Sequence, residues 1–117
     1  MAQKIAVIDY GMGNLRSVSK AVEHVAGDAE VRVTDDPRFI DGADRVVFPG
    51  QGAARDCMAA IGDHHLNQAV SNAAQNKPFL GICMGLQVLM RHSDENGGTA
   101  LLGLFAGEVR RFDGLAV

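Results

Sequence analysis

The chain has 117 residues, a hydrophobic content of 47% and a formal net charge of −3 at pH 7, which suit one small domain with a single core. The acidic balance, with Arg110-Arg111 as the only adjacent basic pair, disfavours nucleic-acid binding. No apolar run reaches the length of a membrane span, and the N-terminus lacks the layout of a signal peptide, so we expect a cytoplasmic protein. The two cysteines, Cys57 and Cys83, predict neither a disulfide framework nor a metal site.

The first third of the sequence predicts a strand, a helix and a second strand. Residues 4–9 form a continuous apolar run, which is typical of a buried parallel strand. Asn14 is suited to cap a helix over residues 15–26, and Gly27 is suited to end it. Residues 30–34 then predict the second strand of the same sheet.

The middle of the sequence continues this alternation. Asp35-Asp36-Pro37 predicts a turn that opens a short helical piece, because proline suits a first helical turn. Residues 45–48 predict a third strand and residues 78–82 a fourth. Between them, helices are expected over residues 53–61 and roughly 66–75.

The last part predicts a helix from Met84 to Met90, a polar loop over residues 93–99 and an extended stretch over residues 101–112. The alternating order predicts an α/β fold, with a parallel sheet covered by helices on both faces in three layers. Loops at the carboxyl ends of parallel strands gather in one crevice, where ligands bind. We therefore expect three loops to converge there: residues 10–14, 49–52 and 81–85.

The sequence Gly81-Ile82-Cys83-Met84-Gly85 is the cysteine form of a nucleophile elbow. Such an elbow places the nucleophile on a sharp, strained turn between a strand and a helix. Neighbouring glycines are needed because the strand and the helix approach each other closely. A buried structural cysteine in a strand–helix turn is the alternative interpretation.

Two further glycine-rich loops follow predicted strands. Pro49-Gly50-Gln51-Gly52 could contribute an amide near Gln51 to an oxyanion hole, together with the Met84 amide after the nucleophile; a plain turn is the alternative. Gly11-Met12-Gly13-Asn14 could cradle a phosphate at a helix start. It lacks the third glycine of a dinucleotide fingerprint, which favours a tight strand–helix turn.

The histidines offer no evident catalytic base. A cysteine nucleophile in acyl transfer normally needs a histidine that a carboxylate orients. We expect His24 and His92 to face solvent, and the adjacent pair His64-His65 to flank a helix cap. Cys57 is interpreted as a small buried hydrophobic residue.

The Cys83 elbow followed by Leu86-Gln87, the loop over residues 49–52 and the opening run Ile8-Asp9-Tyr10-Gly11-Met12-Gly13-Asn14-Leu15 together resemble class I glutamine amidotransferases. Within that family, the chain is most similar to the glutaminase subunits of imidazole glycerol phosphate synthase. The resemblance covers nearly all of the sequence and implies a flavodoxin-like, three-layer amidotransferase domain.

The resemblance also implies roles for individual residues. Cys83 would attack the side-chain amide of glutamine, and the Gln51 and Met84 amides would hold the oxyanion. Gly50, Gly52 and Gln87 would bind glutamine. The ammonia would pass to a (β/α)8-barrel cyclase subunit, which makes imidazole glycerol phosphate and AICAR in histidine biosynthesis. The family needs no metal or organic cofactor for this half-reaction.

Two departures from the family pattern stand out. Position 51 is Gln, where a small apolar residue is common, although the implied role is a backbone one. The family's His-x-Glu pair lies well downstream of the elbow, and the sequence reaches Val117 before any such pair. Residues 1–117 are therefore expected to be the N-terminal part of a single amidotransferase domain. We expect this polypeptide by itself to hydrolyse glutamine poorly, and to expose apolar surface and an open strand edge.

Two other classes remain open on the sequence alone. Deglycase-like and peptidase-like proteins use the same elbow, but they tend to place a histidine directly after the cysteine, where this chain has Met84. A non-catalytic module that binds phosphate through residues 11–14, or only contacts the cyclase, is the second alternative.

Overall fold

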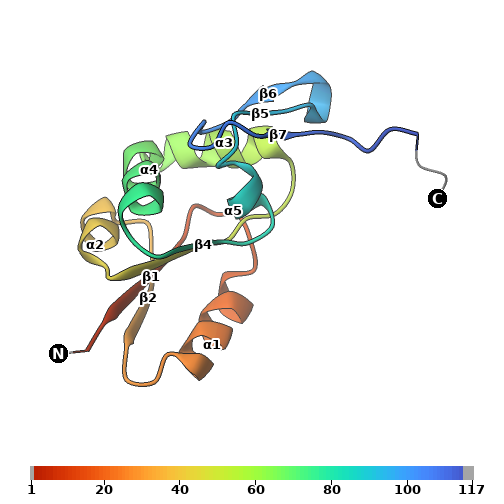
Figure 1. Cartoon of the computed structure of the whole chain (residues 1–117). Helices are drawn as coiled ribbons and strands as arrows, with labels where there is room; N and C mark the ends of the chain where they lie inside the picture. The colour runs from red at the N-terminus through yellow and green to blue at the C-terminus, as the bar shows by residue number, and fades with distance from the viewer. Residues whose placement is uncertain (1, 115–117) are drawn as a thin grey trace.

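Four parallel strands form the central sheet of the protein (Figure 1). The computed structural model describes residues 2–114 of the chain. The strand order β2-β1-β3-β4 is that of a doubly wound, flavodoxin-like sheet, as predicted. The strands are β1 (Lys4–Ile8), β2 (Glu30–Thr34), β3 (Arg45–Phe48) and β4 (Phe79–Gly81); the helices are α1 (Leu15–Val25), α2 (Pro37–Gly42), α3 (Ala54–Asp63), α4 (Asn67–Asn76) and α5 (Met84–Gln87).

The two faces of the sheet bury separate hydrophobic clusters. Ile5 and Val7 of β1 and Val47 of β3 point to the face that α1 covers. The alternate residues of the same strands, such as Ile8 and Phe48, point to the opposite face and pack against α2, α3 and α4. Because helices cover both faces, the inner strands are apolar on both sides, which is why they appear in the sequence as continuous apolar runs.

The ends of α1 follow the predicted capping pattern. The Asn14 side chain accepts a hydrogen bond of 3.2 Å from the backbone N–H of Ser17. Gly27 has a φ of +64°, the left-handed conformation that commonly ends a helix. These local signals fixed the boundaries of α1 to within one residue of the prediction.

The segment after the elbow differs from the prediction. The helix ends at Gln87 rather than continuing to Met90. The backbone N–H groups of residues 102–104 bond the carbonyls of Val88, Met90 and Leu89 at 2.8–2.9 Å, which draws these carbonyls out of the helical pattern. The chain therefore folds back over the end of α5, and only a small part of residues 101–112 is a strand.

A small second sheet replaces the predicted polar loop. Its strands are β5 (His92–Ser93), β6 (Thr99–Ala100) and β7 (Glu108–Val109), with β5 in the centre. The short 3-10 helix η1 (Glu95–Gly97) connects β5 to β6. Strands of two residues carry almost no periodicity, so the sequence pattern could not reveal them.

Lys77 holds the end of α2 against the start of β4. Its ammonium group donates hydrogen bonds to the carbonyls of Ile40, Asp41 and Ala43 at 3.0, 2.8 and 2.8 Å. Lys77→Met keeps the aliphatic stem but leaves these carbonyls without their charged donor, so we expect the free energy of unfolding to fall by about 2 kcal/mol. Urea denaturation measures this change. The exposed Lys20, which pairs with Glu23 at 3.9 Å, supplies the control Lys20→Met, and an equal effect of the two variants would contradict the assignment.

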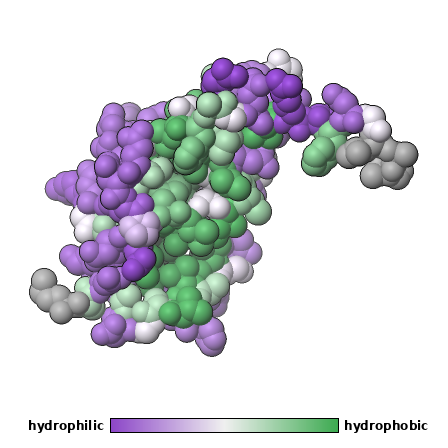
Figure 2. Space-filling view, viewed as in Figure 1, coloured by the Kyte–Doolittle hydropathy of each residue, from purple (hydrophilic) through white to green (hydrophobic). Residues whose placement is uncertain are grey.

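One face of the molecule is apolar and uncovered. Within residues 2–114, β4 pairs only with β3, so its other edge is open there. Leu80 of β4 is 57% exposed and Val25 of α1 is 80% exposed, and both line shallow apolar depressions between β4 and α1. Figure 2 shows the continuous hydrophobic area on this side of the molecule. This agrees with the expected exposure of apolar surface and of a strand edge.

We expect the 117-residue chain to self-associate through this apolar face at micromolar concentrations. Leu80→Lys places a charge in the middle of the face and should shift sedimentation velocity profiles toward the monomer. Phe105→Lys is the matched control, because Phe105 is similarly exposed at 52% but does not line the face. Identical profiles for wild type and Leu80→Lys would rule out this face as the contact.

Candidate active site

Cys83 lies on the sharp turn between β4 and α5, and its side chain is exposed. Its backbone has a φ of 54° and a ψ of −118°, a conformation that residues with a Cβ rarely adopt. Such a conformation costs on the order of 1–3 kcal/mol and persists only where the surrounding structure enforces it. The thiol is therefore presented to solvent at the carboxyl edge of the sheet, which excludes the interpretation of Cys83 as a buried structural cysteine.

The glycines on either side of Cys83 allow this turn. A Cβ on Gly81 would lie 2.8 Å from the Gly85 carbonyl oxygen. A Cβ on Gly85 would overlap the carbonyl oxygen of Phe48, at the end of β3. Both obstacles are backbone atoms, which cannot move aside as a flexible side chain can. The spacing of glycines in the elbow is thus a requirement for close packing of α5 on β3 and β4.

The loop over residues 49–52 lies directly beside the elbow, as predicted. Three successive carbonyls of this loop each accept a hydrogen bond from a different element. The Tyr10 hydroxyl donates to Pro49 O at 2.7 Å, the Met84 N–H donates to Gly50 O at 3.3 Å, and Cys57 Sγ donates to Gln51 O at 3.3 Å. The loop is therefore attached at once to the loop after β1, to α5 and to α3.

The loop over residues 10–14 meets the same edge. A Cβ placed on Gly13 would lie 3.4 Å from the backbone nitrogen of Gly50, so the two loops are in contact. The Gly11 N–H donates to the Asp9 carboxylate at 3.0 Å. The predicted convergence of the three loops is confirmed, and an acidic side chain already occupies the first turn of the loop that resembled a phosphate cradle.

The oxyanion hole suggested by the sequence is not assembled in this structure. The Met84 N–H, which should face an oxyanion, donates to the Gly50 carbonyl instead. The described chain has no cis peptide, and a trans peptide points its carbonyl and its N–H in opposite directions. Because Gly50 O points at Met84, the Gln51 N–H points away from it. The two amides are adjacent but do not face a common point.

The other residues implicated by the sequence surround the same turn. Gly50 is buried, whereas Gln51 and Gly52 are exposed. Gln87 lies one turn along α5, and its backbone N–H donates to the Cys83 carbonyl at 3.2 Å. All six residues named from the sequence thus belong to two adjoining backbone segments.

No described histidine donates to or accepts from Cys83. His24 is exposed on α1, as expected, and His64 caps α3 while its Nδ1 lies 3.3 Å from an Asp35 oxygen. His92 differs from the expectation of a solvent-facing side chain, because it is half-buried in β5, with its ring against Gly98. Within residues 2–114, no three His, Cys, Asp or Glu side chains are grouped closely enough to hold a metal ion.

Three residues to which the sequence analysis gave no such role hold the loop over residues 49–52 and the start of α3 in place. Tyr10 and Cys57 are 1% and 0% exposed, and burial raises the pKa of both side chains. Glu95 accepts a hydrogen bond of 3.1 Å from the Ala54 N–H and so caps α3, which has no capping side chain of its own. Tyr10 is the only tyrosine in the chain and lies in the loop just after the first strand, which is the one signal that could have drawn attention to it.

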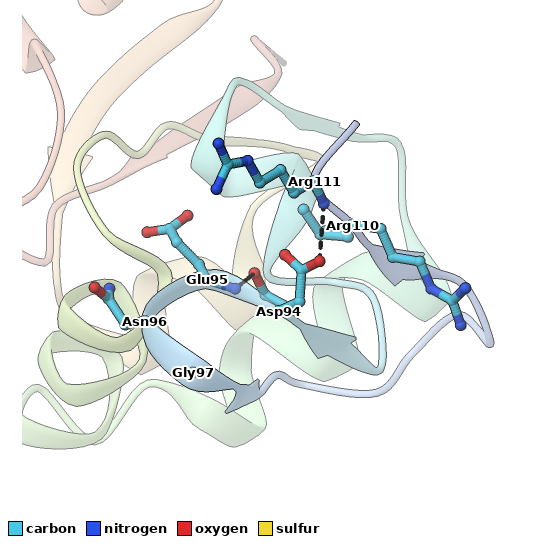
Figure 3. Close-up of a pocket in the computed structure, with 8 residues that line it drawn as sticks. Asp94, Glu95, Asn96, Gly97, Arg110 and Arg111 are labelled. Atoms are coloured by element: carbon cyan, nitrogen blue, oxygen red, sulfur yellow. Dashed lines mark hydrogen bonds between the residues drawn. The ribbon is translucent and has the colours of Figure 1, made fainter. Parts of the chain in front are cut away.

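A separate groove of about 580 Å³ lies between η1 and β7 (Figure 3). Its walls carry both signs of charge, with Asp94 and Glu95 on one side and Arg110 and Arg111 on the other. Asp94 accepts from the Arg111 N–H at 2.9 Å, and Arg110 pairs with Glu108, an interaction that lowers the pKa of that carboxyl. The groove does not include Cys83 or residues 49–52, so it is not part of the candidate active site.

Comparison with known proteins agrees with this geometry. The sequence pattern of the family described as "Glutamine amidotransferase class-I" matches residues 6–100. The chain is 63% identical over 112 residues to "Imidazole glycerol phosphate synthase subunit HisH" of Thiobacillus denitrificans, covering 96% of this chain and 49% of that protein. It is 63% identical over 110 residues to the protein of the same name from Dechloromonas aromatica, covering 94% and 51%. The chain thus spans about half the length of these curated relatives.

A solved structure described as "Crystal structure of glutamine amidotransferase" shares the fold, with a TM-score of 0.67 and 15% identity over 92% of this chain and 56% of that one. Within residues 2–114, no helix has the length and apolar character required to cross a membrane. The family pattern covers the end of the first strand, the loop over residues 49–52 and the elbow that presents Cys83. The chain belongs to the class-I glutamine amidotransferase family.

Proposed function

We propose that this chain supplies the nucleophile of a glutaminase, which hydrolyses glutamine to glutamate and ammonia. The observation that carries the proposal is the exposed Cys83 thiol on a backbone turn with a φ of 54°, in contact through Met84 with the loop over residues 49–52. A strained, solvent-facing cysteine is costly for the fold, and it is found where a nucleophile must be presented.

The proposed reaction has two steps. Cys83 Sγ attacks the side-chain carbonyl carbon of glutamine, the C–N bond breaks, and the thiol proton leaves with the nitrogen as ammonia. Water then attacks the glutamyl thioester, which releases glutamate and returns a proton to the sulfur. Both steps pass through a tetrahedral oxyanion, so both gain from amide donors placed beside the sulfur.

We assign these donors to the Met84 and Gln51 amides. To bring both to one point, the peptide between Gly50 and Gln51 must turn over, which releases Met84 from Gly50 O. Gly50 has no side chain to obstruct this rotation, and the bond to be broken is long at 3.3 Å. Gly50, Gly52 and Gln87 would line the glutamine site next to the sulfur.

Two relatives are named as subunits of imidazole glycerol phosphate synthase, which supports the use of the ammonia by a synthase. We infer that the partner is a cyclase subunit, a (β/α)8 barrel that uses ammonia to form imidazole glycerol phosphate and AICAR in the histidine pathway of the cytoplasm. The support is the 63% identity to two subunits named for that enzyme.

An activated ester tests the proposed nucleophile directly. The γ-glutamyl ester of p-nitrophenol releases a stable phenolate that needs no proton, so it acylates a competent thiol even where no base is in place. We expect a burst of about one nitrophenolate per chain, with the glutamyl group on Cys83 by mass spectrometry. Glutamine itself should turn over slowly, since no described histidine contacts Cys83. Modification elsewhere, or no burst, would overturn the proposal.

A phosphate-binding module is the other candidate function, and one observation opposes it. The N–H of Gly11 is already bonded to the Asp9 carboxylate, whose negative charge would repel a phosphate.

A further inference from the structure

Two buried side chains hold the peptide groups that flank the Gly50–Gln51 peptide. The Tyr10 hydroxyl bonds the carbonyl before it, at Pro49, and the Cys57 thiol bonds the carbonyl after it, at Gln51. Among the described residues, the central carbonyl, at Gly50, has no side-chain donor and accepts a hydrogen bond only from the Met84 N–H. The loop is therefore fixed on both sides of the one peptide that must turn to complete the oxyanion hole.

The surroundings of Tyr10 and Cys57 keep the hydroxyl and the thiol protonated, so both can donate hydrogen bonds. The Tyr10 ring packs on Phe48 with a centroid distance of 5.1 Å, which fixes the direction of its hydroxyl. Burial raises the pKa of both groups, so both remain neutral donors at the pH of the cytoplasm.

We propose that Tyr10 and Cys57 are positioning residues of the oxyanion loop, which act as fixed ends so that only the Gly50–Gln51 peptide rotates. This inference rests on the proposed glutaminase function. Neither side chain contacts the substrate; each acts through the carbonyl that it holds. Without them, the loop would sample several backbone arrangements, and the Gln51 amide would face the oxyanion in only a fraction of them.

The test compares two reactions of Cys83 in the 117-residue chain. Acylation by the γ-glutamyl nitrophenyl ester develops an oxyanion, whereas alkylation by iodoacetamide does not. Tyr10→Phe and Cys57→Val remove a donor with little change of shape. We expect each to slow the maximal acylation rate about tenfold, the effect of losing about one hydrogen bond, while the iodoacetamide rate changes less than twofold. Cys57→Ser keeps a donor and should retain most of the wild-type rate.

Thr34→Val is the control variant, because it removes a side-chain hydrogen bond of 3.0 Å to the Asp36 N–H, at the far edge of the sheet. It should change neither rate. Thermal unfolding identifies any variant that fails to fold, and in that case Cys57→Ser against Cys57→Val remains the deciding pair. Equal acylation rates for wild type, Tyr10→Phe and Cys57→Val would overturn the positioning role while leaving the glutaminase proposal intact.

A wild type that is never acylated would instead overturn the proposed function. In that case, amide hydrogen exchange tests whether Tyr10 and Cys57 hold the loop, independently of any reaction at Cys83. We expect the backbone amides of Gly50, Gln51 and Gly52 to exchange about tenfold faster in Tyr10→Phe and Cys57→Val, with no change in the amides of α4. Unchanged exchange in the loop would exclude Tyr10 and Cys57 as its fixed ends.

Discussion

Replacing Cys83 with glycine is expected to stabilise the fold and, at the same time, to abolish its acylation. The wild-type residue has a φ of 54° and a ψ of −118°, which glycine adopts without a Cβ clash. Relief of about 1–3 kcal/mol of backbone strain is partly offset by the greater freedom of glycine in the unfolded chain, about 0.5–1 kcal/mol. We expect a net gain of about 1 kcal/mol, measured as a higher urea midpoint.

Cys83→Ala is the matched control, because it removes the same thiol but keeps the Cβ and hence the strain. Both variants should react with the γ-glutamyl ester only at the rate of its spontaneous hydrolysis. If the glycine and alanine variants unfolded at the same urea concentration, the strain at Cys83 would be absent. If the glycine variant were less stable than the alanine variant, the backbone of Cys83 would carry no strain. Strain could then no longer support Cys83 as the nucleophile.

A methyl group on Gly85 is expected to disrupt the fold and the site together. In Gly85→Ala the new Cβ overlaps the Phe48 carbonyl oxygen and lies 2.7 Å from the carbonyl carbon. Relief requires α5 to move away from β3, which also separates Cys83 from the loop over residues 49–52. We expect the free energy of unfolding to fall by about 3 kcal/mol or more, with acylation lost in the fraction that remains folded.

Gly42→Ala provides the comparison for this prediction. Gly42 ends α2, its φ is not in the left-handed region, and a Cβ there meets no atom within 4 Å. The same change of Gly to Ala should be neutral, or stabilising by up to about 1 kcal/mol, because alanine favours the helix. Urea denaturation of both variants makes the test. A similar response of Gly42→Ala and Gly85→Ala would show that the contact of α5 with β3 is not tight.

Much of the sheet could be predicted from local pattern. The sequences of β1 and β3 are apolar at consecutive positions because helices cover both faces of the sheet. Asn14 begins α1 through a side-chain hydrogen bond, and Gly27 ends it through its left-handed backbone conformation. The elbow at Cys83 could also be predicted from the sequence, because the turn requires glycines two residues away on each side. Features that depend on residues close together in the chain could therefore be predicted from the sequence.

The tertiary structure alone decided three features, and each depends on contacts between distant segments. α5 ends at Gln87 because residues 102–104 bond the carbonyls that would have continued it. Tyr10, in the loop after β1, and Cys57, in α3, hold the carbonyls of Pro49 and Gln51, which no periodicity in the sequence predicts. The Met84 amide bonds Gly50 rather than facing an oxyanion. A sequence determines which backbone groups exist and their local conformations; which of them pair across the molecule depends on how the packed elements bring them together.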